Sequence, residues 1–163
     1  MIQNGKERDG VPGGTLSNRA LAFACHQLSE YQASNDDPAQ KRIAASNRDL
    51  AIKHYRRAHE LNHENFPALN NLANLYLEWA KRERTTNPVR AEKHLHLAIR
   101  ECEQTIAINP QFHLAYDNMA NTYYELKMFD KAYEGYRNAL RYRPNYPEAA
   151  NDLSHRWSIM ITA

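Results

Sequence analysis

Histidine and cysteine are the side chains of this sequence that could ligate a metal or act as a nucleophile. His59 and His63 are four residues apart, which puts them on one helix face, but no cysteine or carboxylate completes a convergent ligand set. Cys25 precedes His26, and neighbouring helical residues diverge by about 100°, so adjacency alone makes no nucleophile–base pair. After residue 14 the sequence contains a single glycine, Gly135, which excludes a glycine-rich phosphate loop there. The sequence therefore predicts no catalytic residue, no metal site, no cofactor and no enzymatic activity.

Asparagine is the second residue type that could have a functional role, because its carboxamide can form paired hydrogen bonds with a ligand. A carboxamide donates and accepts at once, so it can pair with the peptide groups of an extended chain without reading its side chains. Asparagine is a mediocre helix former, roughly 0.6 kcal/mol worse than alanine, yet it recurs in segments that look helical. An alternative stays open, in which these side chains solvate a face or tie adjacent helices together. The candidate partner-binding residues are Asn70, Asn71, Asn74, Asn118, Asn121 and Asn151, with Asp117, Asp152 and His155 beside them.

The elements that would position these residues are repeated along the sequence. Residues 68–78 read ALNNLANLYLE, and residues 115–125, 47 positions later, read AYDNMANTYYE. A second pattern begins at Ala51, Ala98 and Ala132, with spacings of 47 and 34 residues. Small residues let two helices cross closely, and bulky residues fill the gaps beside the crossing. The repeats therefore predict stacked pairs of antiparallel helices.

This pattern resembles the tetratricopeptide-repeat family, whose 34-residue unit has conserved large, small and aromatic positions on two helices and a closing proline. The unit near 112–145 matches throughout, the preceding unit matches with 13 inserted residues, and the first unit matches only in its second helix. The resemblance implies an all-α, right-handed α-solenoid of about three repeats plus a terminal helix, with first helices lining a concave face. The best-matching residues are Tyr116, Met119, Ala120, Tyr123, Ala132, Tyr136, Ala139 and Pro144.

The asparagine pattern is also similar to the tetratricopeptide superhelix of O-linked N-acetylglucosamine transferases. That resemblance implies an extended peptide as the ligand. The carboxylate clamp of chaperone-binding members requires basic residues where this chain has Glu148 and Asp152. With Asp117, these acids favour a partner segment that carries some positive charge.

Domain and helix boundaries follow from the repeat and from capping residues. We expect a flexible tail over 1–14 and one repeat domain over 15–163, with repeats at about 15–64, 66–111 and 112–145 and a final helix at 146–160. Asp37 and Asn87 each precede a proline at a first helical position, and Asp130 is a third candidate cap. The inserted residues are charged and lack glycine, so two of the repeats are predicted to have lengthened helices.

Composition narrows the class of partner. Net charge is +2 with both signs mixed along the chain, which argues against nucleic acid, and no apolar run predicts membrane insertion. Two cysteines without a C-x-x-C pair favour a reducing compartment, and we expect a cytoplasmic protein.

The end of the sequence supplies a second candidate surface. Trp157, Ile159, Met160 and Ile161 have no later helix to cover them, so they are predicted to form an oligomer or partner interface. The leading interpretation is a non-catalytic module that binds a peptide or a partner protein in an asparagine-lined groove. The alternatives are a structural subunit of a complex or homo-oligomer, and a regulatory fragment of a larger enzyme.

Overall fold

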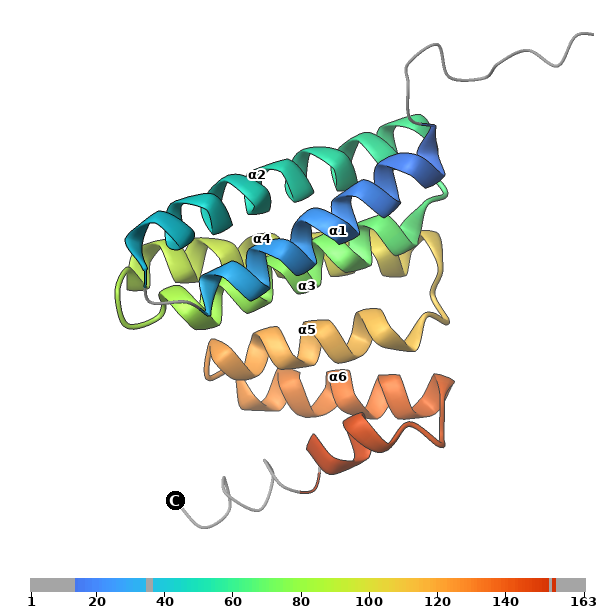
Figure 1. The fold of residues 1–163 in the computed structure, drawn as a ribbon. Coiled ribbons are helices and arrows are strands. Elements are labelled where there is room, and N and C mark those ends of the chain that lie inside the picture. Colours follow the sequence, from blue (N-terminus) through green and yellow to red (C-terminus); the bar gives the residue numbers. More distant parts are fainter. Residues whose placement is uncertain (1–13, 35–36, 153, 155–163) are drawn as a thin grey trace, which may run out of the picture. The chain divides into compact units, whose positions relative to one another are not determined.

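The computed structural model describes residues 14–34, 37–152 and 154, and these residues are largely helical. They divide into two compact units, one up to Ala68 and the other from Leu69 onward. Residues 147–152 form a further helical stretch after the six helices that are labelled in Figure 1. The helices are α1 (Thr15–Ala33), α2 (Pro38–Leu61), α3 (Phe66–Glu83), α4 (Pro88–Ile108), α5 (His113–Glu125) and α6 (Phe129–Tyr142).

Capping side chains fix two helix starts as predicted. Asp37 Oδ1 accepts a hydrogen bond from the Ala39 backbone N–H at 2.9 Å, and Asn87 Oδ1 accepts one from that of Arg90 at 3.0 Å. The predicted cap at Asp130 is wrong, because α6 begins earlier, at Phe129, and Asp130 lies in its first turn. There its carboxylate still favours the positive end of the helix dipole.

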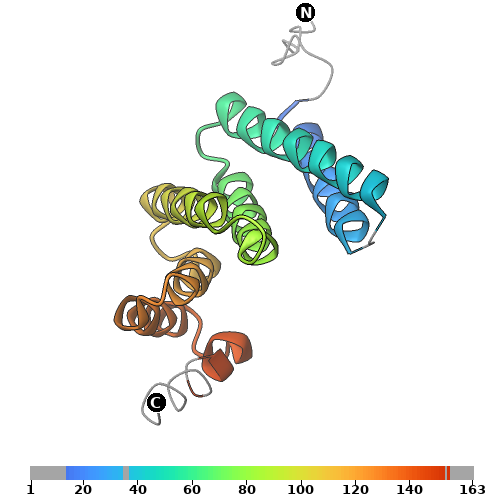
Figure 2. The ribbon, with the colours of Figure 1, turned by 90° about the vertical axis from the view of Figure 1, so that its left-hand side faces the viewer.

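The first unit contains the antiparallel hairpin of α1 and α2, seen side by side in Figures 1 and 2. Polar contacts join both ends of the hairpin. Asn47 Nδ2 donates to Gln32 Oε1 at 2.7 Å, and His54 Nδ1 lies 3.0 Å from Asn18 Oδ1. The fully buried residues are mostly small and comprise Ala22, Ser29, Ala44, Ala51 and Ala58, with Tyr55 the large exception.

The second unit holds two further helix pairs and residues 147–152. Figure 2 shows α4 and α6 in one row and α3, α5 and residues 147–152 in another. The Tyr76 ring of α3 stacks on His94 of α4, with centroids 5.8 Å apart, and α5 packs against both α4 and α6. Ala120, Ala132 and Ala139 form an apolar cluster with Tyr136, Tyr146 and Ala149.

Helix lengths confirm the prediction for the inserted residues. α3 and α4 have 18 and 21 residues, against 13 and 14 in α5 and α6. The first pair is long as well, at 19 and 24 residues. Charged residues with good helix propensity therefore extend the helices instead of forming a loop. Among the described residues, no helix is both long and apolar enough to cross a membrane.

Candidate peptide-binding face

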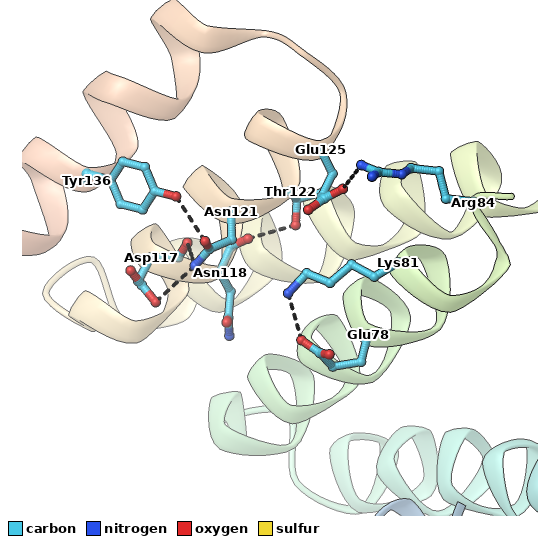
Figure 3. Close-up of polar contacts among 9 residues, drawn as sticks. All are labelled: Glu78, Lys81, Arg84, Asp117, Asn118, Asn121, Thr122, Glu125 and Tyr136. Carbon is cyan, nitrogen blue, oxygen red and sulfur yellow. Dashed lines mark hydrogen bonds and ion pairs between the residues drawn. The ribbon is translucent and has the colours of Figure 1, made fainter. Parts of the chain in front are cut away.

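The candidate site residues lie on α3, α5 and residues 147–152, all in the second unit. Two polar contacts hold α5 beside α3. Asn118 Nδ2 donates to Asn70 Oδ1 at 3.0 Å, and Arg84 forms an ion pair with Glu125 at 2.9 Å, which Figure 3 shows. Ala149 shares the apolar cluster of Ala120, which brings residues 147–152 against the same helix pair. We call the exposed side of these three segments the inner face.

Asn70 serves the contact between helices. It is 7% exposed, and its carboxamide oxygen accepts the hydrogen bond from half-buried Asn118. A buried carboxamide requires such a partner, because burial without one costs free energy. The bond uses only the Nδ2 group of Asn118, whose Oδ1 accepts no hydrogen bond from another described residue.

Asp117 and Asn121 belong to a buried network with two tyrosine hydroxyls. Tyr136 donates to Asn121 Oδ1 at 2.9 Å, and Asn121 Nδ2 donates in turn to Asp117, as Figure 3 shows. Tyr146 donates to the same Asp117 oxygen, Oδ2, at 3.2 Å. Burial and then the negative charge of Asp117 hold the pKa of Tyr146 above its ordinary value, so this hydroxyl stays protonated and can donate. The network joins α5, α6 and the segment before residue 147.

Asn71 and Asn74 differ from these residues. Both are half-buried, and neither carboxamide makes a hydrogen bond with another residue in the part of the chain that the structure describes. Asn74 follows Asn70 by four residues, so it lies on the same side of α3 as the bridge to Asn118. Asn71 lies one turn earlier beside it. These two residues therefore keep their donors and acceptors for water or for a partner.

Comparison with solved structures identifies the fold. The first tetratricopeptide domain of human RPAP3 aligns with a TM-score of 0.60 at 19% identity, over 88% of this chain and 95% of that one. The first such domain of Spaghetti (RPAP3), solved with the HSP90 peptide SRMEEVD, gives 0.59 at 19% over 89% and 96%. The chain has the tetratricopeptide-repeat fold. The Arabidopsis OM64 domain gives 0.56 at 17% over 85% and 95%. No protein-family model and no curated protein sequence matches the chain.

The remaining candidate binding residues of this tetratricopeptide fold lie on residues 147–152 or beyond them in the sequence. Asn151 is exposed and Asp152 is half-buried, both on the helical stretch 147–152. One and two turns beyond Asn74 on α3, Glu78 accepts a hydrogen bond from Lys81 at 2.9 Å (Figure 3). His155, Trp157, Ile159, Met160 and Ile161 lie outside the described residues.

Sequence reasoning missed the residues that tie this face together. Tyr136 matches an aromatic position of the repeat and is 2% exposed, and its hydroxyl also fixes Asn121. Arg84 and Glu125 were not predicted to meet. Buried tyrosine hydroxyls form hydrogen bonds with polar partners. That rule could have predicted a hydrogen bond from Tyr136 to an asparagine on the facing helix.

The residues considered for metal or nucleophile chemistry are not residues of α3, α5 or the stretch 147–152. His59 and His63 contact each other edge to face, with ring centroids 5.3 Å apart. Cys102 of α4 is fully buried, and burial raises the pKa of its thiol. Within the ranges that the structure describes, no three His, Cys, Asp or Glu side chains gather as a metal site.

Proposed function

We propose that the inner face of the second unit binds an extended peptide segment of a partner protein, without catalysis. The observation that carries the proposal is the contrast among asparagines on α3 and α5. The carboxamides of Asn70 and Asn121 form hydrogen bonds within the protein, whereas those of Asn71 and Asn74 form none with another described residue. An available carboxamide that is held half-buried on a rigid helix can pair with a peptide group at little entropic cost.

The fold supports the same class of function. Two solved tetratricopeptide domains carry bound peptides, the Spaghetti domain with SRMEEVD and the second human RPAP3 domain with the HSP70 peptide SGPTIEEVD. Those peptides are ligands of those proteins. For this chain we propose a ligand chosen by its backbone, with side-chain preference set at residues 147–152.

We further propose that the preferred segment carries a basic residue near residues 147–152. Glu148 is exposed and Asp152 half-buried there, whereas the Asp117 carboxylate is buried and bound by Asn121 and Tyr146. Acidic side chains at a rim favour complementary charge in the partner.

The test uses peptides selected on the full chain by phage display and measured by fluorescence anisotropy. Replacing both available asparagines, Asn71→Ala with Asn74→Ala, should weaken binding about tenfold or more, as expected for the loss of two or more hydrogen bonds. Asn138→Ala is the matched control, because Asn138 is also half-buried but lies on α6. Equal affinity in the double variant, or an equal loss in Asn138→Ala, would refute the proposal.

A second comparison tests the basic residue. Exchanging each lysine or arginine of a selected peptide for glutamine should lower its affinity, and Glu148→Gln should reduce that difference. If Glu148→Gln leaves the difference intact, the acidic residues of 147–152 do not set the preference.

A further inference from the structure

Tyr146 joins the stretch 147–152 to the helices before it. Its hydroxyl donates to Asp117 Oδ2 of α5 at 3.2 Å. Its ring meets the His113 ring edge to face, with centroids 5.1 Å apart, and the Arg143 guanidinium lies 5.5 Å from its centroid. The Tyr146 side chain is therefore held both by α5 and by the residue that follows α6.

The backbone of Tyr146 carries this attachment into the stretch. Pro147 is the first helical residue, and the residue before a proline is restricted to extended conformations. The Tyr146 carbonyl accepts a hydrogen bond from the Ala150 N–H at 3.2 Å, which is the first helical hydrogen bond of the stretch. The side chain and the carbonyl of one residue thus fix where the stretch begins and in which direction it runs.

Burial within residues 146–152 points to the same residue. Tyr146 and Ala149 are the two buried residues of this range, at 8% and 0% exposed, whereas Glu148 and Ala150 are exposed. In proteins most helical stability comes from packing of buried residues. A tyrosine ring removes far more apolar surface from water than an alanine methyl group does. The position of the stretch therefore depends mainly on Tyr146.

The Tyr146 hydroxyl also completes the environment of the buried Asp117 carboxylate. Asp117 is 8% exposed, and both Tyr146 and Asn121 donate to its Oδ2 atom. A buried carboxylate that loses a donor is destabilised unless water replaces that donor. Removal of the hydroxyl should therefore let water in beside Asp117 and displace the Tyr146 ring, together with the stretch that it anchors.

We infer that Tyr146 is a positioning residue, whose hydroxyl holds Glu148 and Asp152 at the inner face and so sets the preference for a basic residue in the bound segment. The inference rests on the proposed function, because it concerns the selectivity of the same face. Glu148 and Asp152 follow Tyr146 by two and six residues, so a displacement of Tyr146 moves both carboxylates. Attraction between charges weakens as their separation grows.

The test compares paired peptides on the full chain by fluorescence anisotropy. Each pair is a phage-selected peptide and its counterpart with lysine and arginine replaced by glutamine, and the measured quantity is the ratio of their dissociation constants. In Tyr146→Phe this preference for the basic peptide should fall about threefold or more, while the affinity of the glutamine peptide stays within about twofold. A general loss of structure would instead weaken both peptides alike.

Tyr116→Phe is the matched control. Tyr116 is half-buried beside the same apolar cluster, and its hydroxyl donates to the Pro110 carbonyl at 2.9 Å instead of to Asp117. This variant should keep the preference of the parent chain. An equal fall in Tyr116→Phe would overturn the specific role of Tyr146.

A double variant tests whether Tyr146 acts through Asp117. Asp117→Asn removes the buried charge that the lost hydroxyl leaves with one donor fewer, so its addition to Tyr146→Phe should restore part of the preference. If Asp117 itself attracted the basic residue, the double variant would show a smaller preference than Tyr146→Phe alone. That result would overturn the inference.

Hydrogen exchange of the chain without peptide gives a readout that does not depend on binding. Fragments that contain residues 148–152 should exchange faster in Tyr146→Phe than in the parent chain, whereas fragments of α3 should not change. Unchanged exchange, or an unchanged preference for the basic peptide, would overturn the inference even where the Asn71 and Asn74 changes weaken binding as proposed. A preference that falls in Tyr146→Phe while those asparagine changes have no effect would support the role of Tyr146 and refute the proposed pairing with the peptide backbone.

Discussion

Asparagine residues have two different roles in this protein, and even adjacent asparagines differ in their role. Asn70 is buried and joins α3 to α5, whereas Asn71 keeps its carboxamide available. The two residues are adjacent, and a rotation of about 100° separates their side chains. Stability should therefore depend on the first, and binding on the second.

Asn70→Ala should destabilise the chain by about 1–2 kcal/mol, because the Asn118 amide loses its acceptor in a half-buried position. Urea unfolding followed by circular dichroism measures the change. Asn71→Ala is the neighbouring control and should alter stability by less than about 0.5 kcal/mol. An equal cost for both changes would mean that the bridge contributes nothing specific.

His113 should titrate below the ordinary imidazole value of 6.5, because burial and then the nearby Arg143 cation lower its pKa. Its Nε2 lies 3.1 Å from an Arg143 nitrogen, which requires a neutral ring that accepts the hydrogen bond. Because the folded state binds this proton less readily, the stabilising contribution is complete above pH 6.5 and is lost as pH falls from 6.5 through the lower pKa of the folded state.

NMR titration of the His113 ring protons measures this pKa directly. Arg143→Gln should raise it only part of the way to 6.5, since burial is the larger cause and remains. A midpoint at or above 6.5 in the unmodified chain would contradict the arrangement.

Residue roles on the candidate face were only partly predictable. Repeat position identified Asn70, Asn71, Asn74, Asn118 and Asn121 as one group, and all five lie on α3 or α5. The repeat pattern could not show which carboxamides form hydrogen bonds within the protein. That depends on the side-chain direction at the α3–α5 contact and on tyrosine hydroxyls from another helix, which no local pattern encodes.

At the scale of the helices, a capping residue followed by proline made the starts of α2 and α4 predictable. Asp37-Pro38 and Asn87-Pro88 carry the donors, acceptors and backbone angles that start a helix. Asp130 was the exception, because the turn before it is formed by backbone hydrogen bonds and not by a capping side chain. There the Lys127 and Met128 N–H groups bond back to the Tyr124 and Tyr123 carbonyls, each at 2.9 Å, and close α5.

Lys127 adopts a φ of 60° in this turn, a conformation that glycine accepts more readily. Lys127→Gly should therefore stabilise the chain by about 1 kcal/mol in thermal or urea unfolding. Arg137→Gly, in the middle of α6, should destabilise it by a similar amount. A loss of stability in Lys127→Gly would show that the lysine side chain has a compensating contact.

The α5–α6 crossing depends on the missing side chain of Gly135. A Cβ there would lie 2.8 Å from the Cβ of Ala120 and 3.1 Å from its Cα. Gly135→Ala should cost about 1–2 kcal/mol, because overpacking exceeds the gain of about 1 kcal/mol in helix propensity. Adding Ala120→Gly should recover part of the loss beyond the sum of the single effects, as a double-mutant cycle would reveal.

At the scale of the molecule, the two compact units are built differently. The second unit follows the repeat closely, and its cluster contains Tyr136 and Tyr146 among the alanines. In the hairpin of the first unit the fully buried residues are mostly small, with Tyr55 the large exception. This difference explains why the first helix could not be registered with the repeat from sequence, since its buried residues are not those of the pattern.

Hydrogen exchange should separate the units. Amides of α1 should exchange faster than those of α5 in dilute solution, because small buried residues remove less apolar surface from water. Mass spectrometry of peptic fragments measures both segments in one sample. Equal protection at low concentration would contradict the difference between the units.

The available carboxamides on α3 also have a kinetic consequence. Asn71 and Asn74 have no charge, so they exert no attraction on a ligand at a distance, and attraction before contact is left to Glu148 and Asp152. The contribution of the two asparagines should therefore appear in the residence time of a bound segment, whereas the salt dependence of its arrival rate should come from the two acidic residues. A surface of this kind is suited to sampling many chains briefly and retaining the few whose backbones lie flat along it.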